Sequence, residues 1–412
     1  MKEILGHYIT KIEGHGKLKV DFSKERAELN VDEGERLFEG LVLGRNYEDA
    51  PLISARICGV CPTAHTFAAI DALENALDIK VPEHIADYRK IMLSLQTFQS
   101  HVLHLFFLAT PDYLNIDSAL DLAEKNPAVF QIVLGLKRLA DEGIELIGGR
   151  SIHPVTPVVG GFTKLPDYHE LLLYKNRLEK NLVHAIEAAK LFAKFHYPHM
   201  EREREYLSLQ DSSYPLIGEE VISSMGKSFK VSDYQKNISE KVNSYSTAKF
   251  STKDGKGFMV GSIARVNLKF QLLNKNALDL AKGLFPTNNP FKNNLAQAVE
   301  MVHYMEEIIL LIDKVKGADV AASRISYEVK AGKGAGCIEA PRGLLFHYYE
   351  LNSKGIIINC DIITPTAQNL TSIEDDADEL LKINHHLSRK EQEQQIEMLI
   401  RAYDPCITCS VH

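Results

Sequence analysis

The first clear pattern in the chain is an alternation of apolar and polar side chains. It runs through Leu18–Phe22, stops at Ser23–Arg26 and resumes at Ala27–Val31. A period of two places every second side chain on one face of a strand, and a short polar break between two such runs is typical of a hairpin. The segment therefore predicts a β-hairpin with one buried face.

Most of the remaining chain has the spacing of helices. Apolar residues recur every three or four positions, which places them on one face of a helix. Long helices with broad apolar faces bury one another, so they predict a bundle. The expected helices are Thr63–Leu77, Glu83–Ala109, Pro127–Gly148, His169–Glu205 and Asn289–Val315.

The last quarter of the chain mixes strands and one helix. Gly317–Gly336 is rich in Gly, Ala and Ser and predicts irregular structure. Ser388 and Glu391 form the N-cap and third position of a capping box, which predicts a final helix at Arg389–Arg401. The expected strands are Gly336–Ala340, Leu344–Leu351 and Gly355–Ile363, with turns at Pro341–Gly343 and Asn352–Gly355.

Together these elements predict an α+β fold that is predominantly α, with a large helical-bundle core and small peripheral β-sheets. No internal repeat or low-complexity linker divides the sequence. We therefore expect a single domain over residues 1–412.

The composition limits the partners. Hydrophobic residues make up 45% and charged residues 25% of the chain, as in ordinary globular proteins. The formal net charge of −8 does not suit a general basic surface, so we expect no nucleic-acid partner. No apolar run reaches the ~20 residues of a membrane span, and the first eight residues lack the apolar centre of a secretory signal. We expect no direct membrane insertion.

Four of the six cysteines lie in two Cys-x-x-Cys pairs, Cys58 with Cys61 and Cys406 with Cys409. Each pair can direct two sulfurs to one ion, and four thiolates suit zinc, nickel or iron–sulfur chemistry. A redox dithiol is the other common use of such a pair. Structural zinc sites usually have ~15–20 residues between their pairs, whereas Cys61 and Cys409 are 348 positions apart. This spacing favours a catalytic or redox metal and leaves structural zinc and unrelated thiols open.

The residues around the cysteines resemble the large subunit of nickel–iron hydrogenases. Arg-x-Cys-Gly-x-Cys-x-x-x-His occupies residues 56–65, and Asp-Pro-Cys-x-x-Cys-x-x-His occupies residues 404–412. Three further segments resemble motifs of that family in the same order. They are Ile12–His15, Glu339–Gly343 and Thr364–Asn369. The chain is thereby identified as a member of this family, and its short length and Gln99–His104 resemble the soluble, cytosolic group.

The resemblance implies a catalytic nickel–iron centre that interconverts H2 with protons and electrons. Nickel is held by Cys58, Cys61, Cys406 and Cys409, and Cys61 and Cys409 also bridge to an iron that carries carbon monoxide and cyanide. H2 is split heterolytically, with a proton passing to a nearby base. Thiolates suit this chemistry because they are electron-rich and can take up a proton.

The resemblance also implies roles for five residues around the centre. Arg342 lies over the open side of the metals, as an electrostatic partner of the diatomic ligands or as the base, and Asp404 orients it. Glu13 is the first carboxylate of a proton route. His65 hydrogen-bonds a bridging thiolate, and Thr366 donates to a cyanide. Each residue also has an ordinary structural interpretation, such as an ion-pair arginine, a core histidine or a turn threonine.

A second metal, magnesium or iron, is implied near the C-terminus. Its expected ligands are Glu39, the backbone carbonyl of Ile362 and His412, with Glu33 and Glu35 as competitors for the position of Glu39. A carboxylate, a carbonyl and waters suit a hard divalent cation. Members of the family are usually made with an extension that is removed just past this histidine, so a chain that ends at His412 resembles either the mature form or a member that lacks the extension.

Electrons must leave through partners, because the two remaining cysteines are too few for an iron–sulfur cluster. The resemblance implies an iron–sulfur small subunit, followed by diaphorase-type subunits that serve NAD(P), ferredoxin or a deazaflavin in the cytoplasm. Two alternatives share the ancestry: a hydrogen-sensing regulatory hydrogenase, which keeps the cysteines, and a non-catalytic relative in respiratory complex I, which has lost them.

We expect His101 and His104 to pack in the core from one helix face.

Overall fold

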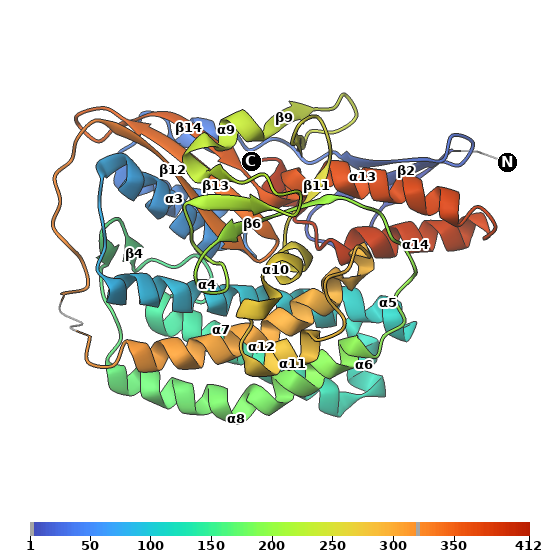
Figure 1. Ribbon diagram of the computed structural model, residues 1–412, viewed down its shortest axis with the longest axis horizontal. Helices are drawn as coiled ribbons and strands as arrows, with labels where there is room; N and C mark the ends of the chain where they lie inside the picture. The colour runs from blue at the N-terminus through green and yellow to red at the C-terminus, as the bar shows by residue number, and fades with distance from the viewer. Residues whose placement is uncertain (1–3, 319–321) are drawn as a thin grey trace.

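The computed structural model of the protein describes residues 4–318 and 322–412. Four long helices form the layer at the bottom of Figure 1. Helix α12 packs against α4 and α8, and α4 also packs against α7. Helix α7 begins and ends where its sequence predicts, because Asn126 caps its first turn, Pro127 follows, and Gly149 ends it in a left-handed conformation. The four are α4 (Glu83–Leu103), α7 (Pro127–Gly148), α8 (Tyr168–Ala193) and α12 (Asn293–Lys314).

The predicted helix over 169–205 is wrong beyond Ala193, where α8 ends. The Tyr197 hydroxyl donates to the carbonyl of Phe192 at 2.8 Å, and the ring of Phe195 stacks on Tyr113, so the chain turns away into an aromatic cluster. Pro198 cannot continue a helix. Glu205, the expected helix end, instead begins strand β6.

The expected helix over 83–109 changes character before its end. Helix α4 ends at Leu103, and His104–Ala109 forms a π-helical stretch before the short α5 (Thr110–Leu114). π-Helical turns are rare and concentrate at functional sites. This one presents His104 to the residues at the C-terminal end of the chain, described below.

Helix α3 (Pro62–Leu77) lies against a three-stranded antiparallel sheet of order β12–β13–β14. Strand β12 (Gly332–Ala340) begins four residues earlier than predicted, inside the segment expected to be irregular; residues 319–321 of that segment lie outside the described part. Gly332, Gly334 and Gly336 face α3, where an added Cβ would lie 2.0–2.5 Å from helix backbone atoms. Strands β13 (Gly343–Leu351) and β14 (Ile357–Ile363) confirm the other two predictions.

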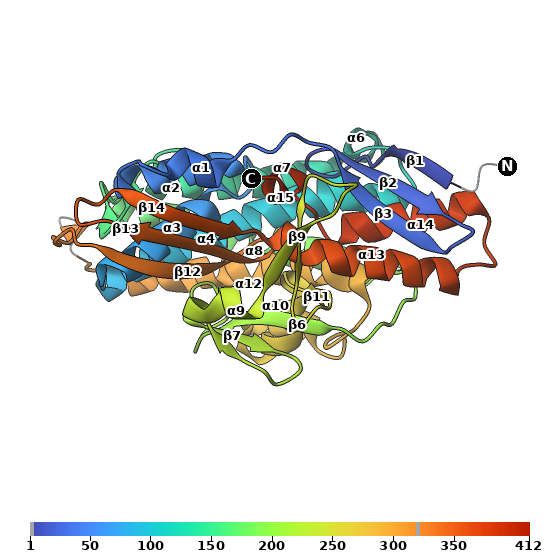
Figure 2. The same ribbon diagram turned by 90° about the horizontal axis from the view of Figure 1, so that it is seen from above.

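Smaller sheets surround this core. The predicted hairpin is confirmed as β2 (Gly16–Asp21) and β3 (Arg26–Val31), with β1 (Ile4–Tyr8) as a third strand. Helix α13 (Pro365–Ile383) packs on β3 and on α14 (Arg389–Ala402), as Figure 2 shows, and α14 carries the predicted capping box.

Residues 205–283 form elements that were not predicted: a sheet of order β11–β6–β7–β8, the β9–β10 pair and short helices. They are β6 (Glu205–Gln210), β7 (Glu220–Ser223), β8 (Phe229–Lys230), β9 (Ser239–Val242), β10 (Lys249–Thr252), β11 (Phe258–Met259), α9 (Tyr234–Asn237), α10 (Ser262–Lys269) and α11 (Lys275–Ala281). The remaining short elements include α1 (Phe38–Val42), α2 (Ala50–Ser54), α6 (Ala119–Lys125), β4 (Pro157–Val158) and β5 (Gly161–Phe162).

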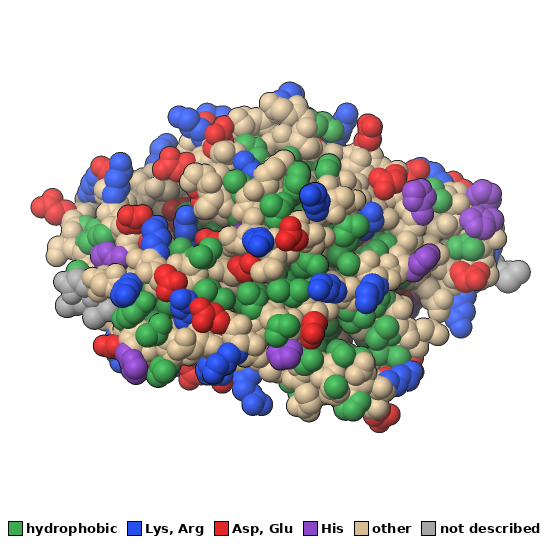
Figure 3. Space-filling model, turned by 60° about the horizontal axis from the view of Figure 1, so that its bottom comes forward, with side chains coloured by type: hydrophobic (Ala, Val, Ile, Leu, Met, Phe, Trp, Pro, Cys, Tyr) green, Lys and Arg blue, Asp and Glu red, His purple; other side chains and the backbone are tan. Residues whose placement is uncertain are grey.

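One large apolar core contains buried residues from Ile9 to Val411 and so involves both ends of the chain. The expected single domain over 1–412 stays a prediction, which this shared core supports. One helical stretch, Glu83–Leu114, is long and apolar enough to cross a membrane, but 83% of its most apolar window is buried inside the protein. On the face where α8 lies, Figure 3 shows charged side chains of both signs among apolar patches.

The contact between α3 and β12 gives a test of the fold. Gly334→Ala should lower the free energy of unfolding by about 1–3 kcal/mol, because its Cβ would lie 2.3 Å from the carbonyl oxygen of Ala72 and backbone cannot yield cheaply. Gly135→Ala is the control: Gly135 lies exposed inside α7 with nothing within 4 Å of an added Cβ, so it should gain about 0.5–1 kcal/mol. Urea denaturation of both variants measures the difference, and equal stabilities would contradict the packing.

Candidate metal centre

The structure brings the two Cys-x-x-Cys pairs together in the interior. Cys58 follows a short 3-10 turn, and Cys61 is the N-cap of α3. Cys406 is the N-cap of α15 (Ile407–Ser410), which contains Cys409. All four side chains are buried. The start and the end of the chain therefore form one site.

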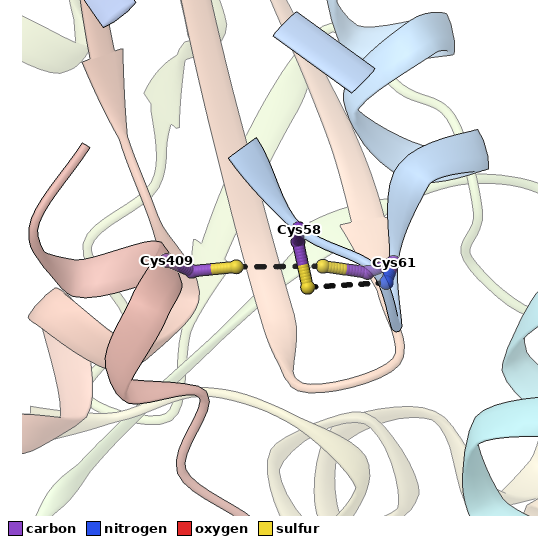
Figure 4. Close-up of side chains that lie close together, drawn as sticks. All are labelled: Cys58, Cys61 and Cys409. Carbon is purple, nitrogen blue, oxygen red and sulfur yellow. Dashed lines mark hydrogen bonds between the residues drawn. The ribbon is translucent and has the colours of Figure 1, made fainter. Parts of the chain in front are cut away.

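The sulfurs of Cys58, Cys61 and Cys409 all lie within 4.8 Å of one another, and Cys406 lies beside two of them. Cys58 Sγ lies 3.4 Å from Cys406 Sγ, Cys61 Sγ lies 3.6 Å from Cys409 Sγ, and the sulfurs of Cys406 and Cys409 are 3.0 Å apart. Figure 4 shows three of these side chains pointing toward one another. Metal–sulfur bonds of about 2.3 Å give sulfur–sulfur edges of about 3.3–3.8 Å. The 3.4 and 3.6 Å separations match these edges, and the 3.0 Å separation is shorter. Four buried cysteines that converge in this way are the donor set of a thiolate-bound metal.

Backbone amides and neighbouring thiols favour the charged form of one of these cysteines. The amides of Val60 and Cys61 donate to Cys58 Sγ at 3.2 and 3.3 Å. Hydrogen bonds from the thiols of Cys406, Cys409 and Cys61 hold the pKa of Cys58 well below its usual value. Burial raises the pKa of Cys406 and Cys409, so Cys58 is the cysteine of the four whose surroundings favour the thiolate, the form that binds metal.

Arg36 joins the two cysteine loops. Its guanidinium Nη2 donates to the carbonyl of Ile57 at 2.7 Å and also to that of Thr408. Its backbone amide donates to the carbonyl of Val411 at 3.1 Å. Neither the cysteine spacing nor the motifs pointed to this residue.

Glu13 lies directly beside one thiol, as its predicted role requires. Its Oε2 accepts from Cys406 Sγ at 3.0 Å and from the amide of Thr408 at 3.1 Å. The backbone of Glu13 also pairs with Cys406 as an isolated parallel bridge. Gly14 has φ of +83°, and an added Cβ there would lie 2.8 Å from Ile407 Cβ, so glycine allows this close approach.

Arg342 and Asp404 form a buried ion pair next to the sulfurs. Arg342 Nη2 donates to Asp404 Oδ1 at 2.9 Å, and its Nε donates to the Asp404 carbonyl at 2.6 Å. Burial opposes the charge of Arg342, but Asp404 and the thiols of Cys406, Cys61 and Cys58 outweigh burial and raise its pKa well above the ordinary value. Its buried Nη1 has no hydrogen-bond partner within the described residues. The guanidinium is thus a fixed cation with one free donor group.

Thr366 and His65 also lie at the sulfurs. The Thr366 hydroxyl accepts from the amide of Cys406 at 2.9 Å, which leaves its hydrogen free to donate elsewhere. His65 Nε2 lies 3.8 Å from Cys409 Sγ, and burial lowers the pKa of His65 to about 3. The predicted cyanide contact of Thr366 stays a prediction.

The expected ligands of the second metal also come together. His412 Nε2 lies 2.8 Å from the carbonyl of Ile362 and 3.8 Å from Glu39 Oε1. Adjacent ligands of octahedral Mg²⁺ are about 3 Å apart, which the His412–Ile362 separation matches, whereas Glu39 lies further away. The kinds of donor, a carboxylate, a carbonyl and an imidazole, are ones that can bind a divalent cation. Lys249 Nζ lies 3.2 Å from both carboxylate oxygens of Glu39 and balances its charge.

The two competing glutamates lie elsewhere. Glu33 accepts from the backbone amide of His15 at 2.6 Å, which places it beside the loop that contains Glu13. Glu35 is exposed. Glu39 is therefore the glutamate that the fold brings to Ile362 and His412.

Several polar residues behind the centre were not predicted as site residues. Gln297 donates to Asp404 Oδ2 at 3.0 Å and accepts from His104 at 2.6 Å. Arg265 donates to the carbonyls of Ala340 and Pro341, directly before Arg342. The buried His101 and His104 confirm the expected core packing, and His101 bonds to the carboxylate of Glu300.

Comparison with known proteins shows the family. The model of the nickel-dependent hydrogenase family matches residues 36–134 and 210–412. The chain is 35% identical to the sulfhydrogenase 1 subunit alpha of Pyrococcus furiosus (98% of this chain, 96% of the relative). It is 28% identical to the NAD-reducing hydrogenase HoxS subunit beta of Cupriavidus necator (98% and 93%). The crystal structure of an NAD⁺-reducing [NiFe]-hydrogenase in the H2-reduced state is similar over the full length of both chains, with a TM-score of 0.87 and 25% identity.

Fold and sequence thus define a metal-dependent oxidoreductase that acts on H2. The chain belongs to the nickel-dependent hydrogenase family, as a catalytic large subunit of the nickel–iron type.

The Arg342–Asp404 pair gives a test of the site. Asp404→Asn should lower the free energy of unfolding by about 3–5 kcal/mol, because it leaves the buried guanidinium without a counter-charge. Glu48→Gln is the control, since Glu48 pairs with Arg324 on the surface and should cost no more than ~1 kcal/mol. Denaturation of the metal-free chain measures both, and a change at Asp404 as small as the control would contradict the buried pair.

Proposed function

We propose that the four sulfurs hold nickel and that Cys61 and Cys409 also hold an iron with carbon monoxide and cyanide ligands. The observation that carries this proposal is the convergence of four buried thiols from the two ends of the chain, with neighbouring sulfurs 3.0–3.6 Å apart. Bound there, the two metals supply an electrophilic site for H2 and a place for its electrons.

The residues of the chain then handle the proton. The Cys406 sulfur takes the proton that H2 releases, and Glu13 Oε2, 3.0 Å away, receives it. The Thr408 amide and hydroxyl both donate to the carboxylate and so fix its orientation. A carboxylate within hydrogen-bond distance of the proton it receives meets the geometric requirement for a general base.

Arg342 acts as a fixed cation and not as the base. Its carboxylate partner Asp404 holds the guanidinium in place, and Nη1 is free to donate to the ligands of the iron. A preorganised donor in a buried site stabilises developing negative charge without reorganisation. Thr366 supplies a second donor, through the hydroxyl hydrogen that the Cys406 amide leaves free.

The second metal is proposed to be Mg²⁺, or iron, bound by Glu39, the Ile362 carbonyl and His412. Burial lowers the pKa of His412, which keeps its ring in the neutral form that binds metals. His412 also contacts the Cys409 carbonyl through its Nδ1. An ion that holds His412 would therefore stabilise the last turn of the chain.

Electrons are proposed to leave through an iron–sulfur small subunit. Cys337 and Cys360, the two cysteines outside the site, lie on β12 and β14 and cannot form a cluster alone. Further electron-transfer subunits would reduce NAD(P), ferredoxin or a deazaflavin in the cytoplasm. One relative is named for NAD reduction and another as F420-non-reducing, so reduction assays with each acceptor must decide.

Exchange between D2 and solvent protons tests the proposal, because it needs the metal centre and the proton route but no electron acceptor. The native complex should produce HD. Glu13→Gln should lower the exchange rate by about 10²–10⁴-fold, since the amide cannot take up the proton.

Glu33→Gln is the matched control for Glu13→Gln. Glu33 lies beside the same loop and bonds to His15, not to a sulfur, so its variant should exchange at the native rate. No exchange by the native, metal-loaded complex would contradict the proposed function. Equal rates in the two variants would remove Glu13 from the proton route.

A further inference from the structure

A chain of buried side chains leads away from Cys409. His65 Nε2 lies 3.8 Å from Cys409 Sγ, and His65 Nδ1 lies 3.2 Å from His347 Nε2. The opposite nitrogen of that second ring, His347 Nδ1, lies 3.0 Å from the Tyr349 hydroxyl. All three side chains are completely buried. Each of the two imidazole rings therefore has a polar neighbour at both of its nitrogens.

The fold fixes this order of residues. His65 belongs to α3, one turn after Cys61, and α3 packs on strand β13. His347 and Tyr349 are two positions apart on β13, so both side chains lie on the same face of the strand. Tyr348, between them, lies on the opposite face and is partly exposed.

Once a metal is bound, the hydrogens available on these side chains allow their hydrogen bonds to point in only one direction. A neutral imidazole has one N–H and one acceptor nitrogen. Complete burial favours the neutral ring. The Cys409 sulfur, as an unprotonated metal-bound thiolate, can only accept a hydrogen bond, so His65 must donate from Nε2 and accept at Nδ1. His347 must then donate from Nε2, and its Nδ1 accepts from the Tyr349 hydroxyl, which also contacts Ser54 and Cys360.

We propose that His347 and Tyr349 are positioning residues that fix the tautomer of His65 and strengthen its hydrogen bond to the Cys409 thiolate. The inference rests on the proposed function, since it requires a metal-bound thiolate. Hydrogen bonds that point the same way polarise one another, by about 10–30% per bond. This series of hydrogen bonds would thus withdraw electron density from the Cys409 sulfur, which is proposed to hold both metals.

Infrared spectra of the native complex test the inference through the carbon monoxide and cyanide bands. Tyr349→Phe keeps the ring and removes one hydroxyl. It should leave the bands present but shift them to lower wavenumber, because a weaker hydrogen bond leaves more electron density on the metals. His347→Leu should shift them further in the same direction. Tyr348→Phe removes a hydroxyl from the other face of the same strand and should leave the bands at their native positions.

The outcomes separate the two proposals. Native bands that do not move in Tyr349→Phe would overturn the inference and leave the proposed function intact. A shift of equal size in Tyr348→Phe would also overturn it, because the effect would then be a general response of β13. If His347→Leu does not take up metal, Tyr349→Phe alone decides. A metal-loaded native complex without these bands would defeat the proposed function and the inference with it.

Discussion

The site depends on one constraint: the two ends of the chain must meet in the interior. Cys58 and Cys406 are 348 positions apart, yet their sulfurs lie 3.4 Å from each other. The Glu13–Cys406 bridge and the contacts of Arg36 hold the two loops in register. Closing so long a loop costs conformational entropy that local contacts cannot offset, so the packed helical core must provide the stabilisation.

Burying charge around the sulfurs is the second requirement. Arg342 has Asp404, and Arg265 has both Glu300 and Glu339, all within the core. Burial raises the pKa of Glu339, whereas Arg265 and His101 hold that of Glu300 low despite burial. Arg265 also bonds the carbonyls before Arg342, so the deeper network sets the position of the guanidinium that faces the thiols.

The sequence alone was sufficient to predict the helices and strands whose signals are local. The capping box at Ser388 predicted the start of α14, and the 3.6-residue period of apolar positions predicted α7. The strands of residues 205–259 could not be predicted, because they are short and their pairing is not local: β11 pairs with β6 from some fifty residues away. The end of α8 depends on an aromatic cluster that includes Tyr113, far away in sequence.

The candidate site divides in the same way. The cysteines could be found because each pair is local and lies in a specific motif. Choosing among three glutamates for the second metal required the fold, since Glu39 meets Ile362 across 323 positions. His347 and Arg265 carried no motif signal of their own; their importance follows only from the partners that the fold gives them.

The central claim is that the four sulfurs share a nickel ion, and anomalous X-ray scattering from crystals of the native complex tests it most directly. Data collected just above and just below the nickel absorption edge should give a difference peak among Cys58, Cys61, Cys406 and Cys409, about 2.3 Å from their sulfurs, with an iron peak beside Cys61 and Cys409. A peak at the zinc edge in that position, with no nickel signal, would contradict the account.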